Sequence, residues 1–464
     1  MPRALRASAL LALLLVLARP ASAQVQGPIY IIQPGDNLTV IAARFGTRLD
    51  ELMAVNGFDL AHVLQPGERI IIPGLEGIGG VLTTHTVEFG ENLTTLSLRF
   101  GLSPEAVLRL NHTANPERLY AGQELVVTQP EEAAPASVVS EVRIERGRLA
   151  PLASGEPLLL SAAKSGLNPW ALAQVNGLQS FADQFTGRTL YVAEGDQPLR
   201  AWPAPITDVR FRTLPLTQGR TAEVHVGASP GARVQGVLAS YTLNFGESDN
   251  AWVALQGLPA MIDPGVYPFS IRLQLEDGTT REFSQDVAVA SGDYPNEAPL
   301  VVNPETLDPA VNQRELETMR ALVAAFTPDR AWSAPFSEPV DTGVTSSFGR
   351  RRLFNGTYAT YHAGIDYAGR VGREIFAPAG GRIVFTGSQD VCGTATVIDH
   401  GWGIFSRICH QDSVSVQTGQ TIVEGERIGT IGRSGRVTGP HLHWEIWVGG
   451  VQVDPQQWLD ELFP

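Results

Sequence analysis

The sequence predicts a multidomain, β-rich protein that contains three small β-α-α-β repeats, a β-sandwich and a C-terminal antiparallel β domain. Three observations support this fold class. At 464 residues the chain is too long for one ordinary domain, since domains average about 150 residues. Its 47 glycines and 32 prolines favour turns and short elements over a helical bundle. Landmark residues also recur in register along the first part of the chain, which indicates internal repeats.

The composition excludes several classes of protein. A formal net charge of −14 argues against nucleic-acid binding and against attraction to anionic lipid through bulk charge. Two cysteines exclude a disulfide-dense scaffold and a multi-cysteine zinc site. A hydrophobic content of 43% is enough for buried cores. Any chemistry must therefore come from histidines, carboxylates or hydroxyl groups.

The N-terminus predicts export. Residues 1–23 begin with arginines, continue with an apolar run from Ala7 to Ala18 and end in a small-residue cleavage pattern, which is typical of a signal peptide. The alternative is an uncleaved membrane anchor. About twelve apolar residues are too few for this, because a spanning helix needs about 20. We therefore expect an exported protein with no stable membrane span after cleavage.

Three stretches, 29–74, 84–129 and 149–194, share one pattern. A short strand leads to a Gly-Asp or Gly-Glu pair that can cap a helix, apolar residues then follow helical spacing, and a second strand closes the unit. A glycine suits the end of the first helix and an asparagine the end of the second. The landmarks of the first two units are Asp36, Asn37, Gly46 and Asn56, and Glu91, Asn92, Gly101 and Asn111. The third unit is fainter, since Glu156-Pro157 replaces the acidic pair.

These repeats resemble the LysM module. The resemblance covers residues 30–73 and 85–128 well and the third unit poorly. It implies binding to glycans that contain N-acetylglucosamine, such as the peptidoglycan backbone. The candidate glycan-binding residues are Asp36, Asn37, Glu91 and Asn92. The alternative is that the repeats are spacers that bind nothing.

Residues 203–292 alternate in short strands, such as Thr221–Val226 and Ser270–Leu275, separated by turns such as Asp263–Gly265. About ninety residues of this kind favour an immunoglobulin-like β-sandwich. We interpret His225 as an ordinary strand residue, because it has no metal-ligating partner at motif spacing.

Residues 293–340 have the composition of a Pro-rich connector with one helix, which we expect at Arg314–Phe326. We interpret this segment as a spacer between domains. The alternative is a helix that docks on the C-terminal domain and covers a groove there.

Five of the nine histidines lie within the last part of the chain. They are His362, His400, His410, His441 and His443. His362 stands four residues before Asp366, and His441 stands two before His443, so each pair can share one face of a strand. Two imidazoles and a carboxylate suit zinc and leave its fourth tetrahedral position for water. Each pair alone is a weak signal, but together they predict a catalytic zinc site.

The region 341–458 resembles the lysostaphin-type (LytM-like) zinc endopeptidases, which cut peptide cross-links of peptidoglycan. The matching stretches are Thr345–Arg350, His362–Asp366, Ala377–Gly381, Val397–Gly401, Gly432–Gly435 and Thr438–His443. The resemblance implies that His362, Asp366 and His443 bind one zinc ion and that His410 and His441 are catalytic. His410 departs from the family's Tyr-X-His-Leu stretch, because Ile408 and Gln411 replace the Tyr and the Leu. We interpret His400 as a structural residue of a hairpin turn.

In such a site zinc lowers the pKa of bound water. His410 and His441 share the tasks of accepting the water proton, stabilising the oxyanion and protonating the leaving amine. The sequence leaves open which histidine does which. Cys392 and Cys409 flank the predicted hairpin turn, so we expect a disulfide between them. The alternative is two buried thiols.

The sequence thus predicts an exported zinc endopeptidase, secreted and cell-wall associated or periplasmic, monomeric, and targeted to peptidoglycan by its repeats. A non-catalytic scaffold that activates another wall hydrolase is the first alternative. It is disfavoured because all five chemical positions are present. A D,D-carboxypeptidase is the second, and it is disfavoured by the longer His-to-Asp gap of its metal motif. The bond cut, a glycine bridge or a direct D-Ala cross-link, stays open, as does latency imposed by residues 292–340.

Overall fold

The computed structural model divides the chain into two units, residues 1–83 with 128–136, and residues 84–127 with 137–464. It describes residues 27–59, 61–112, 119–129, 146–151, 172, 176, 189–198, 206–228, 231–248 and 251–464. The predicted signal peptide, 1–23, lies outside these ranges. Within them, no helix has the length and apolar character that crossing a membrane requires.

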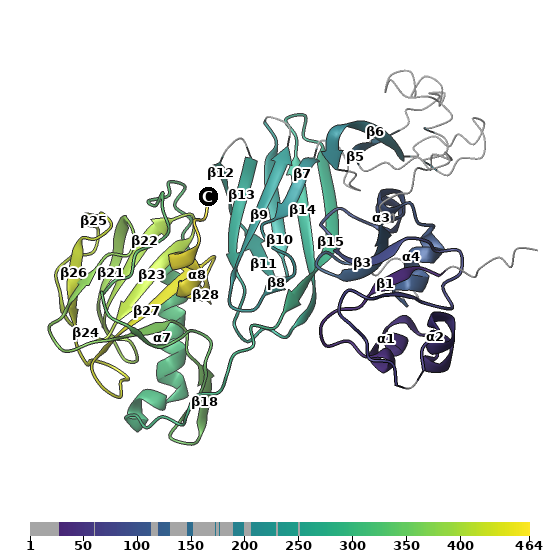
Figure 1. The fold of residues 1–464 in the computed structure, drawn as a ribbon. Helices are drawn as coiled ribbons and strands as arrows, with labels where there is room; N and C mark the ends of the chain where they lie inside the picture. The colour runs from purple at the N-terminus through teal and green to yellow at the C-terminus, as the bar shows by residue number, and fades with distance from the viewer. Residues whose placement is uncertain are drawn as a thin grey trace, which may run out of the picture. The chain divides into compact units, whose positions relative to one another are not determined.

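The first unit contains a β-α-α-β repeat (Figure 1). Its elements are β1 (Ile29–Ile31), α1 (Leu38–Phe45), α2 (Leu49–Asn56) and β2 (Arg69–Ile71), with β1 antiparallel to β2. The Asn37 side chain caps α1 by accepting from the Val40 amide, and Gly46 ends the helix at a positive φ of 64°. Helix α2 runs to Asn56, but its C-cap is Gly57, at a positive φ of 67°, and not the predicted asparagine. Asn56 instead fixes the closing strand, because its side chain bonds both the N–H and the C=O of Ile71 at 2.7 and 2.8 Å.

A second repeat of the same kind follows, most of it in the second unit. Its elements are β3 (Val81–Thr86), α3 (Leu93–Phe100), α4 (Pro104–Leu110) and β4 (Glu124–Gln129). Asn111 bonds the N–H and C=O of Val126, as Asn56 does in the first repeat. Of the predicted third repeat, 149–194, most lies outside the described residues. Strands β5 (Arg146–Pro151) and β6 (Thr189–Pro198) pair antiparallel there, and Asn176 donates to the Leu172 carbonyl at 2.8 Å.

Two sheets with a shared core follow the repeats, as the predicted β-sandwich requires. One has the order β12-β13-β9-β7 and the other β11-β10-β14-β15-β8. The strands are β7 (Ile206–Phe211), β8 (Leu216–Thr217), β9 (Thr221–Ala228), β10 (Arg233–Leu238), β11 (Tyr241–Leu243), β12 (Phe245–Ser248), β13 (Ala251–Gly257), β14 (Gly265–Gln274) and β15 (Thr280–Ala290). His225 lies on β9, beside Glu223. The immunoglobulin-like topology stays a prediction.

The C-terminal domain is built on a sheet with the order β16-β19-β27-β23-β22-β21-β25, to which β28 adds beside β27. These strands are β16 (Val344–Ser346), β19 (Ile365–Ala368), β21 (Gly381–Gln389), β22 (Gly393–Gly401), β23 (Ile404–Cys409), β25 (Thr421–Ile422), β27 (His441–Val448) and β28 (Val451–Val453). Smaller sheets are formed by β17 (Arg351–Phe354) with β18 (Tyr358–Tyr361), and by β20 (Glu374–Phe376), β26 (Arg427–Ile431) and β24 (Gln411–Val414). Helix α8 (Pro455–Asp460) ends the domain, and Trp444 and Trp458 are buried in its core. The β-rich fold class that the sequence predicts is confirmed.

Residues 293–340 form part of the C-terminal domain, so their interpretation as a spacer was wrong. Helix α7 (Pro309–Leu322) lies beside the strands of the C-terminal domain (Figure 1). Its Met319 packs in one cluster with Phe405 and Trp447 of the large sheet. The segment after the helix sends Phe336 into the domain core. Two of the prolines that suggested a linker begin helices. Pro309 begins α7 and Pro304 begins a preceding 3₁₀ turn (Pro304–Leu307), where the missing N–H costs nothing.

Candidate metal centre and active site

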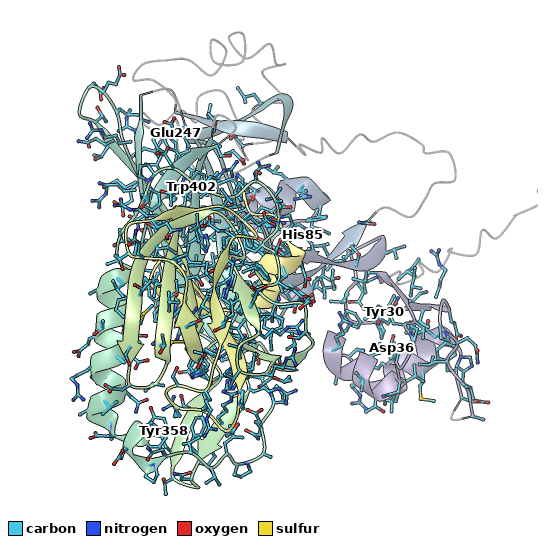
Figure 2. All side chains as sticks on the ribbon, turned by 90° about the vertical axis from the view of Figure 1, so that its left-hand side faces the viewer. Tyr30, Asp36, His85, Glu247, Tyr358 and Trp402 are labelled. Carbon is cyan, nitrogen blue, oxygen red and sulfur yellow. A yellow bond between two sulfur atoms is a disulfide. The ribbon has the colours of Figure 1, made fainter. Side chains whose placement is uncertain are left out.

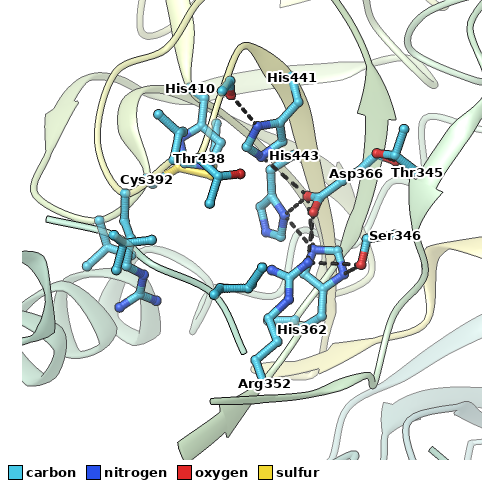
Figure 3. Close-up of a pocket in the computed structure, with 18 of the residues that line it drawn as sticks. Thr345, Ser346, Arg352, His362, Asp366, Cys392, His410, Thr438, His441 and His443 are labelled. Carbon is cyan, nitrogen blue, oxygen red and sulfur yellow. Dashed lines mark hydrogen bonds and ion pairs between the residues drawn. A yellow bond between two sulfur atoms is a disulfide. The ribbon is translucent and has the colours of Figure 1, made fainter. Parts of the chain in front are cut away.

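One pocket of the C-terminal domain collects the predicted site residues from separate elements (Figure 3). Its lining includes His362, Asp366, His410, His441 and His443. Antiparallel pairing of β19 with β27 sets Asp366 directly opposite His443. The hairpin β17–β18 delivers His362 from the loop that follows it. Residues separated by as many as 81 positions therefore meet because the sheet register is fixed.

Three donor atoms converge at the centre of this pocket. His362 Nε2 lies 2.9 Å from Asp366 Oδ1 and 3.0 Å from His443 Nδ1, and that Nδ1 lies 2.7 Å from Asp366 Oδ1. All three residues are buried. A tetrahedral zinc ion about 2.1 Å from each ligand would hold these atoms roughly 3.4 Å apart. The donor set therefore fits zinc after a small outward movement of each atom.

The outer nitrogens of both ligand imidazoles face acceptors. His362 Nδ1 lies 2.9 Å from the Ser347 carbonyl oxygen, and His443 Nε2 lies 3.2 Å from Glu445 Oε1. With a metal bound, each ring could donate its proton to these outer acceptors, which would leave the lone pair of the inner nitrogen for the metal. This is the tautomer that a metal ligand requires.

Burial and neighbouring charge set the protonation states in the pocket. Burial alone would raise the pKa of Asp366, but His362 and His443 outweigh it and hold that pKa well below its usual range. Burial lowers the pKa of His362. Burial also acts to lower the pKa of His443, yet Asp366 and Glu445 raise it above the ordinary value. At neutral pH the set thus contains an ionised carboxylate, as a metal site needs.

His410 and His441 lie beside the three donors, with their ring centroids 4.8 Å apart. Nδ1 of each ring lies 2.8 Å from a backbone carbonyl oxygen, that of Ser434 for His410 and that of Gly439 for His441. Both rings therefore carry the proton on Nδ1 and have an unprotonated Nε2 that can act as a base. Burial lowers the pKa of His410 well below its ordinary value, and the neighbouring His441 and His443 lower it further.

A disulfide joins Cys392 and Cys409 beside this pair of histidines. Cys392 also accepts the His410 N–H with its carbonyl oxygen at 2.8 Å. Cys409, His443 and Glu445 form a second group with metal-ligating atoms close together. Because Cys409 is disulfide-bonded, it has no thiolate to offer, and the second group does not fit a metal.

The sequence motifs did not indicate two charged residues of the site, Arg352 and Glu445. Arg352 donates to Asp366 Oδ2 at 2.9 Å, and Glu445 supports His443 from within the same strand. The sequence could have indicated Glu445, since it stands two residues after His443 and so shares its strand face. No sequence pattern indicated Arg352. His400 is fully buried on β22, with Nδ1 2.6 Å from the Gly380 carbonyl oxygen and Nε2 2.8 Å from Ser406 Oγ, as a structural role requires.

The four candidate glycan-binding residues make hydrogen bonds inside their own repeats. Asp36 accepts from the Tyr30 hydroxyl at 2.8 Å, and Figure 2 shows the two residues close together. Asn37 and Asn92 cap helices. Glu91 is buried and pairs with His85 at 2.7 Å. A glycan role for these four residues stays a prediction.

Comparison with known proteins identifies relatives of parts of the chain. Residues 360–455 match Peptidase family M23, and residues 30–73 and 85–128 match the LysM domain, which confirms both resemblances. Peptidoglycan DD-endopeptidase ShyA of Vibrio cholerae serotype O1 is 38% identical over 119 residues, 25% of this chain and 28% of the relative. DD-carboxypeptidase/endopeptidase Mpg of Neisseria meningitidis serogroup B is 38% identical over 116 residues, 25% of this chain and 27% of the relative.

The matched region thus spans less than a third of the length of these curated relatives. Among solved structures, a candidate M23 peptidase from Pseudomonas aeruginosa is 25% identical, with a TM-score of 0.42 over 54% of this chain and 96% of that chain. The catalytic domain of lysostaphin from Staphylococcus simulans is 25% identical, with a TM-score of 0.24 over 26% of this chain and 94% of that chain.

Proposed function

We propose, for a chain that carries a Peptidase family M23 domain behind two LysM domains, that the whole protein is a zinc-dependent endopeptidase acting on the peptide cross-links of bacterial peptidoglycan. The observation that supports this most is the convergence of His362 Nε2, Asp366 Oδ1 and His443 Nδ1 within 3.0 Å of one another. Two further histidines with unprotonated Nε2 atoms stand beside them, so the pocket holds a full set of groups for metal-assisted hydrolysis.

In this proposal His362, Asp366 and His443 hold one zinc ion. Zinc, when bound, supplies Lewis-acid polarisation of the scissile carbonyl and acidifies a water molecule. One of His410 and His441 accepts a proton at Nε2, and either, once protonated there, can donate to the leaving amine. The Ser434 and Gly439 carbonyls keep the Nδ1 protons in place, so each ring exchanges protons through Nε2 alone.

The names of the relatives bear on which peptide bond of the cross-link is cut. ShyA and Mpg are both named for DD activity, so we propose a bond between D-amino acids of a direct cross-link in preference to a glycine bridge. The LysM domains would hold the glycan chains, and the predicted signal peptide would place the monomeric protein outside the cytoplasm, in the periplasm or at the cell wall.

Digestion of purified peptidoglycan tests the proposal. The full chain is incubated with the wall polymer, with and without a chelator, and the products are analysed by mass spectrometry and amine counting. We expect new amines and uncross-linked stem peptides without the chelator, none with it, and recovery when zinc is restored. Intact peptides under all conditions would support the non-catalytic scaffold instead.

A further inference from the structure

A chain of buried charged residues links helix α7 to the metal ligand His443. Glu315 on α7 pairs with Arg407 of β23, and Arg407 Nη1 lies 3.3 Å from Glu445 Oε1. The same Glu445 oxygen lies 3.2 Å from His443 Nε2. The Glu445 carboxylate therefore lies between the Arg407 guanidinium and the His443 imidazole, within reach of both. Glu315 therefore acts on His443 through two intermediates.

A second chain reaches the ligand Asp366 from the other side. Glu297 Oε2 accepts from Arg352 Nε at 2.6 Å, and Arg352 Nη2 donates to Asp366 Oδ2 at 2.9 Å. Figure 3 shows the Arg352 guanidinium directed at Asp366. Since Oδ2 is held in this way, Oδ1 is the carboxylate oxygen that faces His362 and His443. Arg352 thus sets which oxygen the carboxylate presents to a metal.

Glu315 also reaches the loop that holds His410. Its two carboxylate oxygens accept from the backbone amides of Val391 and Cys392 at 2.6 and 3.1 Å. The Cys392 carbonyl in turn accepts the His410 N–H at 2.8 Å. Glu315 therefore contacts Arg407, which leads to the metal ligand His443, and Cys392, which bonds the backbone of His410.

The two chains pair buried carboxylates with guanidiniums. The four carboxylates of Glu297, Glu315, Asp366 and Glu445 face two guanidiniums, those of Arg352 and Arg407. Buried ion pairs seldom stabilise a fold more than apolar residues of the same size would. A role in holding the metal ligands explains the position of these buried ion pairs better than a contribution to fold stability does.

Building on the proposed function, we propose that the segment 293–340 completes the metal centre, with Glu315 and Glu297 as positioning residues. Glu315 fixes Arg407 and through it the Glu445–His443 pair, while Glu297 fixes Arg352 against Asp366. Supports of this kind typically change metal affinity by 10- to 100-fold when removed.

Zinc affinity of the full chain tests this inference separately from activity. Apo protein carrying Glu315→Gln competes for zinc with a chromophoric chelator, and the Co²⁺-substituted protein reports ligand geometry through its visible spectrum. We expect about 10-fold or weaker zinc binding and an altered Co²⁺ spectrum. Arg407→Lys keeps the charge but cannot contact Glu315 and Glu445 at once through separate guanidinium nitrogens. It should also weaken zinc binding.

Two controls on the same helix separate positioning from folding. Glu317→Gln changes an exposed carboxylate that contacts Gln313 at 2.7 Å, so zinc binding should be unchanged. Met319→Ala removes a buried contact with the large sheet and should lower stability without weakening zinc binding. Wild-type affinity in Glu315→Gln, or equal weakening in Met319→Ala, would overturn the inference while leaving the proposed function intact. Failure of the wild-type chain to bind zinc would instead overturn the proposed function.

Discussion

His443 and His441 lie two residues apart on β27, but their surroundings differ, and we expect His443 to bind metal and His441 to transfer protons. His443 Nδ1 lies 2.7 Å from Asp366 Oδ1, whereas His441 Nε2 lies 3.6 Å from it. We therefore predict that His443→Ala loses both zinc and activity. His441→Ala should keep zinc and lose turnover by about 10²- to 10⁴-fold, the usual range for a general acid or base. Metal analysis with rate measurements checks both, and a zinc-replete, fully active His441→Ala protein would contradict the assignment.

His400 gives a prediction for stability against pH. Complete burial lowers the pKa of His400 to about 4, from an ordinary value of 6.5. Between these values the unfolded chain binds a proton that the folded chain does not, so folding stability falls as the pH falls. The loss from this residue between pH 7.5 and pH 5 should be about 2 kcal/mol.

Urea unfolding of the wild type and of His400→Gln at both pH values measures this contribution. The variant is expected to be less stable overall but to lose less stability on acidification. The same pH dependence in both proteins would show that His400 titrates alike in the folded and unfolded states.

His441 and His443 could be predicted from the sequence because their spacing within one strand is local information. His362 lies before the strand of Asp366, so those two residues do not share a strand face as expected, and the motif and the family resemblance indicated them together with His410. Arg352 and Glu315 could not be predicted, since each acts on the ligands through contacts that only the folded sheet creates. Glu315 and Arg407 are 92 positions apart, and no local pattern pairs them. The side chains of Asp36 and Glu91 bond residues of their own repeats. Acidic residues of a repeat motif can therefore stabilise the repeat and need not bind a ligand.

At the scale of the element, Phe89 is the buried aromatic side chain in the contact between the second repeat and the β-sandwich, where Gln285 and a bridge from Ala121 to Val287 also contribute. Phe89 is 2% exposed, and its ring centroid lies 4.7 Å from that of Phe269 and 5.2 Å from that of Phe283. We predict that Phe89→Ala lowers the free energy of unfolding by about 3–5 kcal/mol. The exposed Glu105→Gln of α4 is the matched control. A loss below about 1 kcal/mol, the level of an ordinary surface change, would mean that this contact does not fasten the repeat.

Helix α7 shows why its docking could not be predicted. Its buried residues are Glu315 and Met319 alone, so the sequence lacks the wide apolar stripe that identifies a docked helix. The buried charge of Glu315 is matched by Arg407, which is distant in sequence. By contrast, the first two β-α-α-β repeats were predictable because glycine and asparagine landmarks mark their helix ends and closing strands.

At the scale of the whole molecule, the net charge of −14 constrains how the chain can bind a cell wall. If the chain binds the wall as proposed, we expect contact with sugars, and not attraction to anionic polymers, to provide the affinity. We predict that the full chain sediments with purified peptidoglycan and is released by soluble N-acetylglucosamine oligomers. Raising the salt concentration should release little of it. Release by salt but not by the oligomers would contradict glycan binding by the LysM domains.

Hydrolysis of one purified, cross-linked muropeptide dimer tests the central claim most directly. The zinc-loaded full chain should convert the dimer into two monomers whose summed mass exceeds that of the dimer by one water, with the oxygen of isotopically labelled water in the new carboxylate. His443→Ala, handled identically, should leave the dimer intact. A dimer that survives the zinc-loaded wild-type protein, or that is cleaved equally by His443→Ala, would contradict zinc-dependent peptide hydrolysis at this site.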